Sequence, residues 1–170
     1  MDDSLERLRG QIRSLRRSRQ AGREKPHKPV MLLALLDLLD RGAVTTNQFY
    51  FDTLLIDRFS ILFAAVAKIG DWRQAAPPFF HLRTSGFWAH QPKQGREKAY
   101  ADLRSSGGGY RRIRDNIEFA FFEEWAWNVV VDPANRTVLR ELVLDHFFSS
   151  EERYRLMLVI DQSTRSAQDM

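Results

Sequence analysis

Residues 25–42, KPHKPVMLLALLDLLDRG, predict the centre of this protein's core. The ten residues Val30–Leu39 contain one polar side chain, that of Asp37. A run that is apolar nearly all round predicts a buried helix. Pro29 suits its first turn, because the N–H that proline lacks would have no intrahelical partner there, and Gly42 suits the position just past its end.

Basic side chains stand where this helix begins. His27 and Lys28 immediately precede Pro29, and Lys25 lies two residues before His27. The first N–H groups of a helix have no intrahelical acceptor, and the helix dipole places partial positive charge at the same end. The start of the helix is therefore a candidate site for an anion such as phosphate.

The flanking segments are also expected to be helical. Residues 3–22 form an amphipathic pattern, with Leu5, Leu8, Ile12 and Leu15 on one stripe and arginines around it. This segment either packs on the core with its arginines along a phosphate backbone, or is a basic arm that orders on binding. A second apolar helix is expected over 47–68, with Thr45 or Thr46 as its N-cap.

A second informative stretch is PPFFHLRTSGFW, residues 77–88. Residues 71–78 are expected to form an extended loop stiffened by Pro77 and Pro78. The alternation over 79–90 predicts a β-hairpin that turns at residues 84–86. His81 and Arg83 would then lie beside an apolar corner. The alternative is an ordinary hairpin whose aromatic residues are core and whose His81 and Arg83 are solvated.

Residues 91–114 are polar, basic and rich in glycine. Three successive glycines allow close approach to a groove, and aromatic and basic residues flank them. The segment contains neither a Walker-type nor a dinucleotide glycine pattern, so it is not interpreted as a nucleotide pocket. It is either a flexible surface loop or a DNA-facing one. In the second case the candidate base or groove contacts are Arg104, Gly108, Tyr110, Arg111 and Arg112.

Length and composition predict one compact domain. The chain has 170 residues, 44% of them hydrophobic, and no cysteine. We expect an α+β fold, mostly helical with a small antiparallel sheet or hairpin. Its parts would be a basic N-terminal helix or arm (1–22), the main domain (23–162) and a disordered tail (163–170). The sequence contains neither an apolar signal segment nor a membrane span, so we expect a soluble cytoplasmic protein.

The basic residues are concentrated in two segments. Residues 7–28 hold nine Lys or Arg against one acidic residue, and residues 83–114 hold eight against two, although the net charge is only +4. This distribution is typical of a protein that binds nucleic acid. The alternative is a pair of solvated surfaces.

The sequence offers no recognisable catalytic motif. Its four histidines form no metal-binding pattern, there is no thiolate ligand, and no HNH core is present. We therefore expect a binding module with no catalytic residues, no metal and no cofactor. A catalytic site assembled from distant residues, or a protein-interaction domain with incidental basic segments, are the alternatives from other classes.

The two stretches together, PHKPVMLLALLDLLDRG and PPFFHLRTSGFW, resemble the sulfur-binding domain of McrA-type type IV HNH restriction endonucleases. The resemblance covers roughly residues 20–150. It implies recognition of double-stranded DNA in which sulfur replaces a non-bridging phosphate oxygen. Because no HNH motif follows here, the chain would be the recognition domain of a bacterial restriction system, with cleavage supplied by a C-terminal nuclease domain or a partner nuclease.

The resemblance also implies roles for the quoted residues. Pro77, Pro78 and Phe79 would form the sulfur recess, while His27, Lys28, His81 and Arg83 would bind the remaining oxygens and flanking phosphates. The phosphorothioate keeps its charge, whereas its sulfur is a poorer hydrogen-bond acceptor and is less costly to place against carbon. The alternative is a DNA-binding domain of an HNH endonuclease that has no sulfur preference or recognises another modification.

Overall fold

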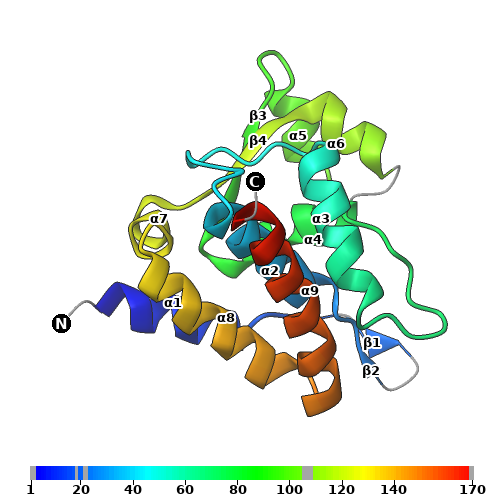
Figure 1. Ribbon diagram of the computed structural model, residues 1–170. Coiled ribbons are helices and arrows are strands. Elements are labelled where there is room, and N and C mark those ends of the chain that lie inside the picture. Colours follow the sequence, from blue (N-terminus) through cyan, green and yellow to red (C-terminus); the bar gives the residue numbers. More distant parts are fainter. Residues whose placement is uncertain (1–2, 18, 21–22, 105–108, 169–170) are drawn as a thin grey trace.

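The computed structural model describes residues 3–17, 19–20, 23–104 and 109–168 of the chain (Figure 1). In chain order the elements are α1 (Asp3–Arg13), β1 (Arg19–Gln20), β2 (Arg23–Glu24), α2 (His27–Asp40), α3 (Thr53–Ala64), α4 (Ala76–His81), the 3₁₀ helix η1 (Leu82–Ser85), β3 (Trp88–Pro92), α5 (Glu97–Asp102), α6 (Tyr110–Asn116), β4 (Ile117–Phe122), α7 (Glu124–Val130), α8 (Pro133–Phe147) and α9 (Ser150–Gln168). The architecture is α+β, mostly helical with a small antiparallel sheet, as the sequence predicts.

Helix α2 lies in the middle of the molecule (Figure 1) and contacts α3, α4 and α8. Every residue from Val30 to Leu39 is buried, so the prediction of a central helix is confirmed. Gly42 adopts a positive φ of 67° and its N–H donates to the carbonyl of Leu39 at 3.1 Å. A left-handed residue at this position ends the helix, which explains why glycine stands there.

The one polar side chain of the apolar run pairs with the next helix. Asp37 of α2 forms an ion pair with Arg58 of α3, and the two side chains are only 2% and 5% exposed. The Arg41 guanidinium lies 3.8 Å from the same carboxylate. This buried pair ties α3 to α2, the helix whose first residues line the cavity described below.

The segment before α3 is extended instead of helical. Phe49 pairs with Ala120 of β4 through hydrogen bonds of 2.8 and 2.9 Å in both directions. The N-cap of α3 is Asp52, whose carboxylate accepts from the N–H of Leu55 at 3.2 Å. The predicted helix over 47–68 was therefore too long, and the predicted cap at Thr45 or Thr46 was wrong, because β4 provides a strand partner far along the chain.

The predicted hairpin over 79–90 was wrong. Pro77 and Pro78 occupy the first turn of α4, where proline is tolerated. Residues 79, 80 and 82 are all buried, because this short helical segment is covered on most of its sides. Their burial does not reflect the two faces of a strand. The strand begins only at Trp88, and it pairs with β4 so that Trp88 faces Phe122 and His90 faces Ala120.

The structure also differs from the predictions for residues 91–114 and for the C-terminal tail. Residues 91–114 are not a single loop, because α5 and the start of α6 lie within them, with residues 105–108 outside the described part. Helix α9 continues to Gln168, over residues for which the sequence suggested a disordered tail. The division at residues 22 and 162 stays a prediction.

The N-terminal segment packs on the body of the protein over residues 3–13. Leu8 and Ile12 of α1 are buried, and α1 contacts α7 and α8. Residues 3–13 therefore pack on the core, as the first of the two alternatives predicts, while the placement of arginines along a phosphate backbone stays a prediction. None of the described helices is long and apolar enough to cross a bilayer.

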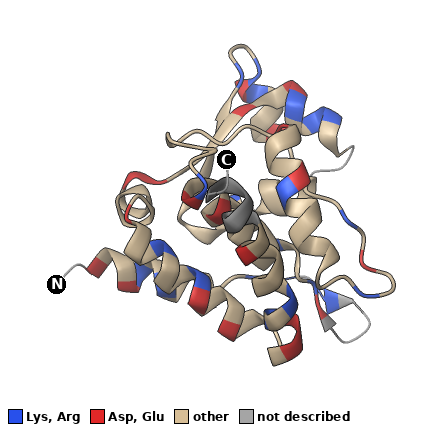
Figure 2. Cartoon of the chain, in the orientation of Figure 1, with Lys and Arg blue, Asp and Glu red and all other residues tan. Residues whose placement is uncertain are grey.

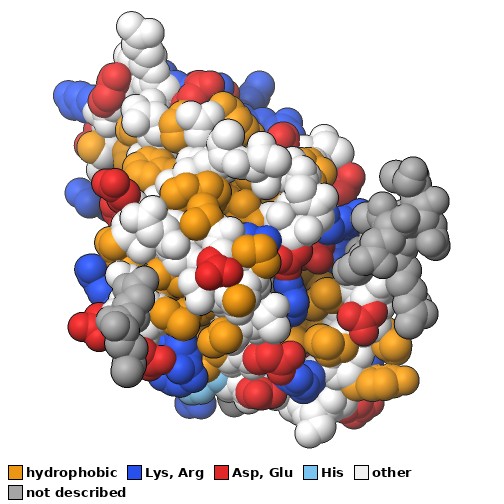
Figure 3. All heavy atoms as spheres, turned by 60° about the vertical axis from the view of Figure 1, so that its left-hand side comes forward, with side chains coloured by type: hydrophobic (Ala, Val, Ile, Leu, Met, Phe, Trp, Pro, Cys, Tyr) orange, Lys and Arg blue, Asp and Glu red, His pale blue; other side chains and the backbone are white. Residues whose placement is uncertain are grey.

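Charges are less segregated in space than along the chain (Figure 2). Arg9 pairs with Glu6 at 2.5 Å, and Arg17 pairs with Glu24. On the face brought forward in Figure 3, acidic and basic side chains stand beside one another. Some of the positive charges of residues 7–28 are therefore paired with carboxylates. Fewer of them are left for a polyanion than the sequence count suggests.

Candidate nucleic-acid interface

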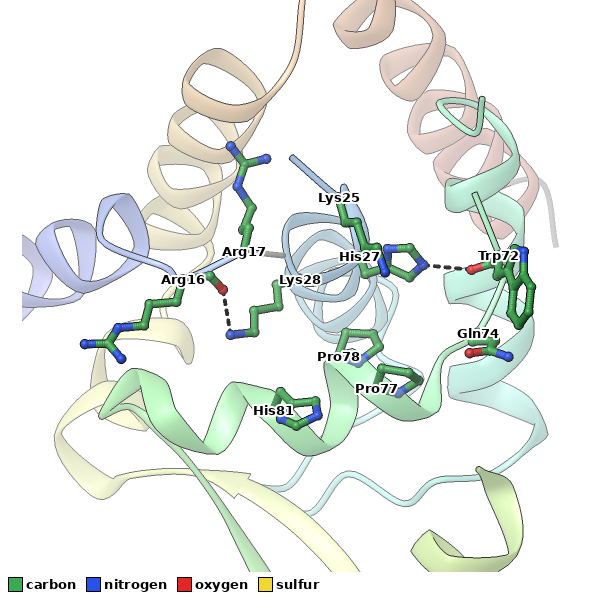
Figure 4. A pocket seen from close by; sticks show the side chains of 10 residues that line it. All are labelled: Arg16, Arg17, Lys25, His27, Lys28, Trp72, Gln74, Pro77, Pro78 and His81. Atoms are coloured by element: carbon green, nitrogen blue, oxygen red, sulfur yellow. Dashed lines mark hydrogen bonds between the residues drawn. The ribbon is translucent and has the colours of Figure 1, made fainter. Parts of the chain in front are cut away.

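A cavity of about 450 Å³ opens at the start of α2 (Figure 4). Its walls come from the segment that follows α1, the first residues of α2, the loop that precedes α4, and α4 itself. The lining residues are Arg16, Arg17, Lys25, His27, Lys28, Trp72, Gln74, Pro77, Pro78 and His81. Among these described residues none is acidic, so the cavity combines positive charge with the proline rings of one wall.

His27 fixes the loop opposite α2. Its Nε2 donates to the backbone carbonyl of Trp72 at 2.7 Å. Its ring packs at 4.7 Å from the ring of Phe63 in α3, between centroids. This places the histidine at the junction of α2, α3 and the loop. The side chain of Trp72 itself stays 70% exposed at the rim of the cavity.

Lys28 bridges α2 and the segment after α1. Its ammonium donates to the carbonyl of Arg16 at 2.7 Å (Figure 4). Burial lowers the pKa of Lys28, and the charge of Arg16 lowers it further. An ammonium has three donors, so Lys28 can hold this carbonyl and still donate to an anion. Desolvation makes an incoming negative charge more favourable here than at an exposed lysine.

The wall formed by α4 is apolar, and hydrogen bonds to β3 hold it in place. Pro78 is buried and Pro77 is partly exposed. The carbonyl of Phe79 in the same helix accepts two hydrogen bonds from β3, from Trp88 Nε1 at 3.1 Å and from His90 Nε2 at 3.0 Å. These bonds anchor α4 to the sheet and so fix the position of both proline rings.

His81 ends α4 and lines the cavity beside the prolines. Burial lowers its pKa, and the charges of Lys28 and Arg83 lower it further. The neutral imidazole that this favours donates one hydrogen bond from the protonated ring nitrogen and accepts one at the other.

Two predicted residues lie away from the cavity. Phe79 is fully buried, with its ring 4.9 Å from that of Phe51, and does not line the recess. Arg83 donates to the carbonyl of Leu103 at 3.1 Å and lies over the ring of Phe80 at 4.0 Å. Arg83 therefore connects η1 to the end of α5, and it reaches the cavity only through its effect on the pKa of His81.

The predicted base-contacting residues form a separate basic surface. Arg104, Arg111 and Arg112 are exposed. Tyr110 is also exposed, and its ring lies 5.3 Å from that of Phe51. Gly108 lies outside the described residues. Helix α6 contacts α4, so this surface adjoins the helix that carries Pro77 and Pro78 without lining the cavity.

Sequence reasoning missed part of the lining. Arg16 and Arg17 were assigned only to a general basic helix, and Lys25 only to the basic start of α2. Trp72 and Gln74 were read as loop residues, and the sole signal available was their position just before the two prolines. Within the described residues, no group of three His, Asp or Glu side chains could hold a metal ion.

Positive charge and an apolar wall within one cavity define a domain that binds the phosphodiester backbone. The family described as ScoMcrA-like, DNA sulfur-binding domain matches residues 5–160, and the chain belongs to this family.

The fold is similar to that of a solved structure, the sulfur binding domain of SprMcrA complexed with phosphorothioated DNA. The TM-score is 0.64 at 14% sequence identity, over 92% of this chain and 93% of that chain. At this identity the likeness is one of fold. A comparison with curated proteins gave no match.

Proposed function

We propose that the cavity at the start of α2 binds a phosphorothioate linkage of double-stranded DNA. The observation that carries this proposal is that proline rings and cationic side chains line the same cavity. The sulfur would lie against Pro77 and Pro78. Lys28 would bind the remaining oxygen, and His81 would lie between Lys28 and the proline rings.

The chemistry of sulfur supports this arrangement. A phosphate oxygen placed against the proline rings would lose its hydrogen bonds to water, at a cost of about 1–3 kcal/mol. Sulfur, which is larger and a weaker acceptor, loses less. Burial of a few tens of Å² of sulfur surface adds about 1 kcal/mol. The preference for sulfur would then be at least about tenfold, while most of the affinity comes from phosphate contacts.

A binding titration tests the proposal. The purified chain is titrated with one duplex in two versions, identical except for a stereodefined phosphorothioate, at two salt concentrations. We expect both affinities to fall with salt and their ratio to persist, because the sulfur preference does not depend on counterion release. Equal affinity for the two duplexes would reject the recess and leave a general DNA-binding domain.

Replacement of Lys28 by alanine is expected to weaken binding of both duplexes by about 10- to 100-fold. The reason is the loss of a charge-assisted hydrogen bond worth about 1.5–3 kcal/mol. Arg41→Ala is the matched control, since it removes one positive charge at the opposite end of the same helix. A Lys28 variant that binds as well as the Arg41 variant would remove Lys28 from the site.

Replacement of Pro77 by serine is expected to lower the preference for sulfur, by about tenfold. A hydroxyl at this wall could donate to a phosphate oxygen and so cancel the penalty that oxygen suffers there. Pro77→Ala is the control, because it removes the ring without adding a donor, and its effect on the ratio should be smaller. The comparison is the ratio of Kd values for the two duplexes. Identical ratios for wild type and the serine variant would contradict the role of Pro77.

We further propose that the chain targets a nuclease of a bacterial type IV restriction system that acts in the cytoplasm. The cleaving part would be an HNH domain or a partner protein. Support comes from the family. Incubation of the purified chain with phosphorothioate DNA and Mg²⁺ or Mn²⁺ should give binding without cleavage, whereas metal-dependent nicking would overturn the assignment.

A further inference from the structure

A second cavity lies beside the first and has no role in the site described above. This groove, of about 680 Å³, runs between α1 and η1. Arg7, Gly10, Gln11 and Ser14 line it from the side of α1, and Ser85 lines it from η1. Arg16 lines both cavities, so the groove continues from the site at the start of α2.

The residues from α1 form one stripe. Positions 7, 10, 11 and 14 are three and four residues apart, which places them on the same face of a helix. The N–H of Ser14 donates to the carbonyl of Gly10 at 3.1 Å, so the helical turn reaches this residue. At 1.5 Å per residue the stripe is about 10 Å long, which equals the rise of about three nucleotides along one DNA strand.

The side chains of the stripe are suited to phosphate. The Arg7 guanidinium lies 3.9 Å above the ring of Trp125, and stacking of this kind holds its face while its N–H edge can still donate. Arg16 and Ser14 are exposed. Glu6 also lines the groove, and it forms an ion pair with Arg9 at 2.5 Å, which offsets its charge.

Gly10 leaves the middle of the stripe open. A Cβ placed at this residue would meet nothing within 4 Å. The backbone of the helix can therefore come close to a ligand here, as glycine permits.

We propose that this groove binds the sugar–phosphate backbone of the strand whose phosphorothioate occupies the first cavity, through the two or three phosphates that follow it on one side. The inference rests on the proposed function for the identity of the first site. The groove would increase the affinity for DNA and position the strand. It would not add to the preference for sulfur, because it contacts the neighbouring phosphates and not the phosphorothioate.

Gly10→Asp and Gly10→Asn test the proposal as a matched pair. The two side chains have nearly the same size and differ in charge, and neither meets a neighbour at Cβ. We expect Gly10→Asp to bind both duplexes about fivefold more weakly than Gly10→Asn, the effect of one unit charge about 4 Å from a phosphate in water. The ratio between sulfur and oxygen duplexes should be the same for the two variants.

Arg7→Gln supplies a second measurement. Loss of one phosphate contact should lower the slope of log K against log salt by about 1. Should Gly10→Asp unfold, as seen by circular dichroism, Ser14→Asp against Ser14→Asn replaces the first pair.

The outcomes separate the two proposals. Equal affinities within the Asp and Asn pair, with the sulfur preference of the wild type intact, would overturn the groove and leave the proposed function standing. A wild type without sulfur preference, whose affinity still falls in Gly10→Asp, would reject the recess and support the groove as a DNA-backbone site.

Discussion

Asp37→Ala is expected to lower the free energy of unfolding by about 3–5 kcal/mol, because it leaves the Arg58 guanidinium charged and buried without its partner. Both side chains lie in the core between α2 and α3, where water cannot replace the lost carboxylate. Since domains of this size are stable by only about 5–15 kcal/mol, the variant should unfold at much lower urea concentration. Urea denaturation followed by circular dichroism measures the change.

Two further variants make this test specific. Asp57→Ala changes an exposed aspartate of α3 and should shift the free energy of unfolding by no more than about 0.5 kcal/mol. Asp37→Leu combined with Arg58→Met replaces the pair by apolar side chains, which is often neutral or stabilising. If Asp37→Ala were as stable as Asp57→Ala, the pair would contribute nothing to the attachment of α2 to α3.

The buried pair also bears on the cavity. His27 at the start of α2 packs on Phe63 of α3, and through Trp72 it holds the loop of the cavity. The relative position of the two helices therefore sets the distance between the basic wall and the loop. An Asp37 variant should therefore lose DNA affinity through the weakened contact between α2 and α3 and through its unfolded population, since the carboxylate itself does not line the cavity.

The central helix could be predicted because the information is local. Ten nearly continuous apolar residues, a proline in the first turn and a glycine at the end are each properties of short range. His27 and Lys28 were identified as candidates from this local signal of a helix start, whereas Pro77 and Pro78 were assigned to the site through the family resemblance, and all four line one cavity.

The errors have the opposite cause. The strand partner of β3 lies at residues 117–122, and the alternation over 79–90 contains no sign of that pairing. An apparent strand pattern at Phe79 and Phe80 arose because this short helix is buried on most sides. Arg83 has the residue type of a phosphate ligand, yet its hydrogen bond to Leu103 depends on α5, a neighbour that no local pattern reveals.

The free energy of unfolding is expected to fall as the pH is lowered from 6.5 towards 4, and His90 is the reason. Burial between aromatic rings lowers the pKa of His90 to about 4, a shift that the hydrogen bond to the carbonyl of Phe79 partly opposes and the charge of Arg83 reinforces. The neutral ring donates through Nε2 to that carbonyl at 3.0 Å and accepts at Nδ1 from the hydroxyl of Tyr100 at 2.8 Å. In the protonated ring Nδ1 also carries a hydrogen, so it can no longer accept the hydrogen bond from the Tyr100 hydroxyl.

The sign follows from the two pKa values. Above pH 6.5 the histidine is neutral in both states, and stability is complete. Between pH 6.5 and about 4 the unfolded chain binds a proton that the folded protein does not. The free energy of unfolding therefore falls by about 2 kcal/mol by pH 5 and by about 3 kcal/mol in all. Urea denaturation at pH 7.5 and pH 5 should show this loss in the wild type and in the control His146→Gln, an exposed histidine.

His90→Gln should lack that part of the pH dependence, although it is less stable at pH 7.5 because the stacking on Phe80 is gone. An unchanged pH dependence in His90→Gln would mean that other groups cause the loss. The same histidine anchors α4 through the carbonyl of Phe79, and with a pKa of about 4 it stays mostly neutral in the folded protein at pH 5, so the wall that carries Pro77 and Pro78 keeps this hydrogen bond. His90 is therefore expected to lower stability over this pH range without changing the preference of the folded protein for sulfur over oxygen, which a titration of both duplexes at pH 7.5 and pH 5 would show.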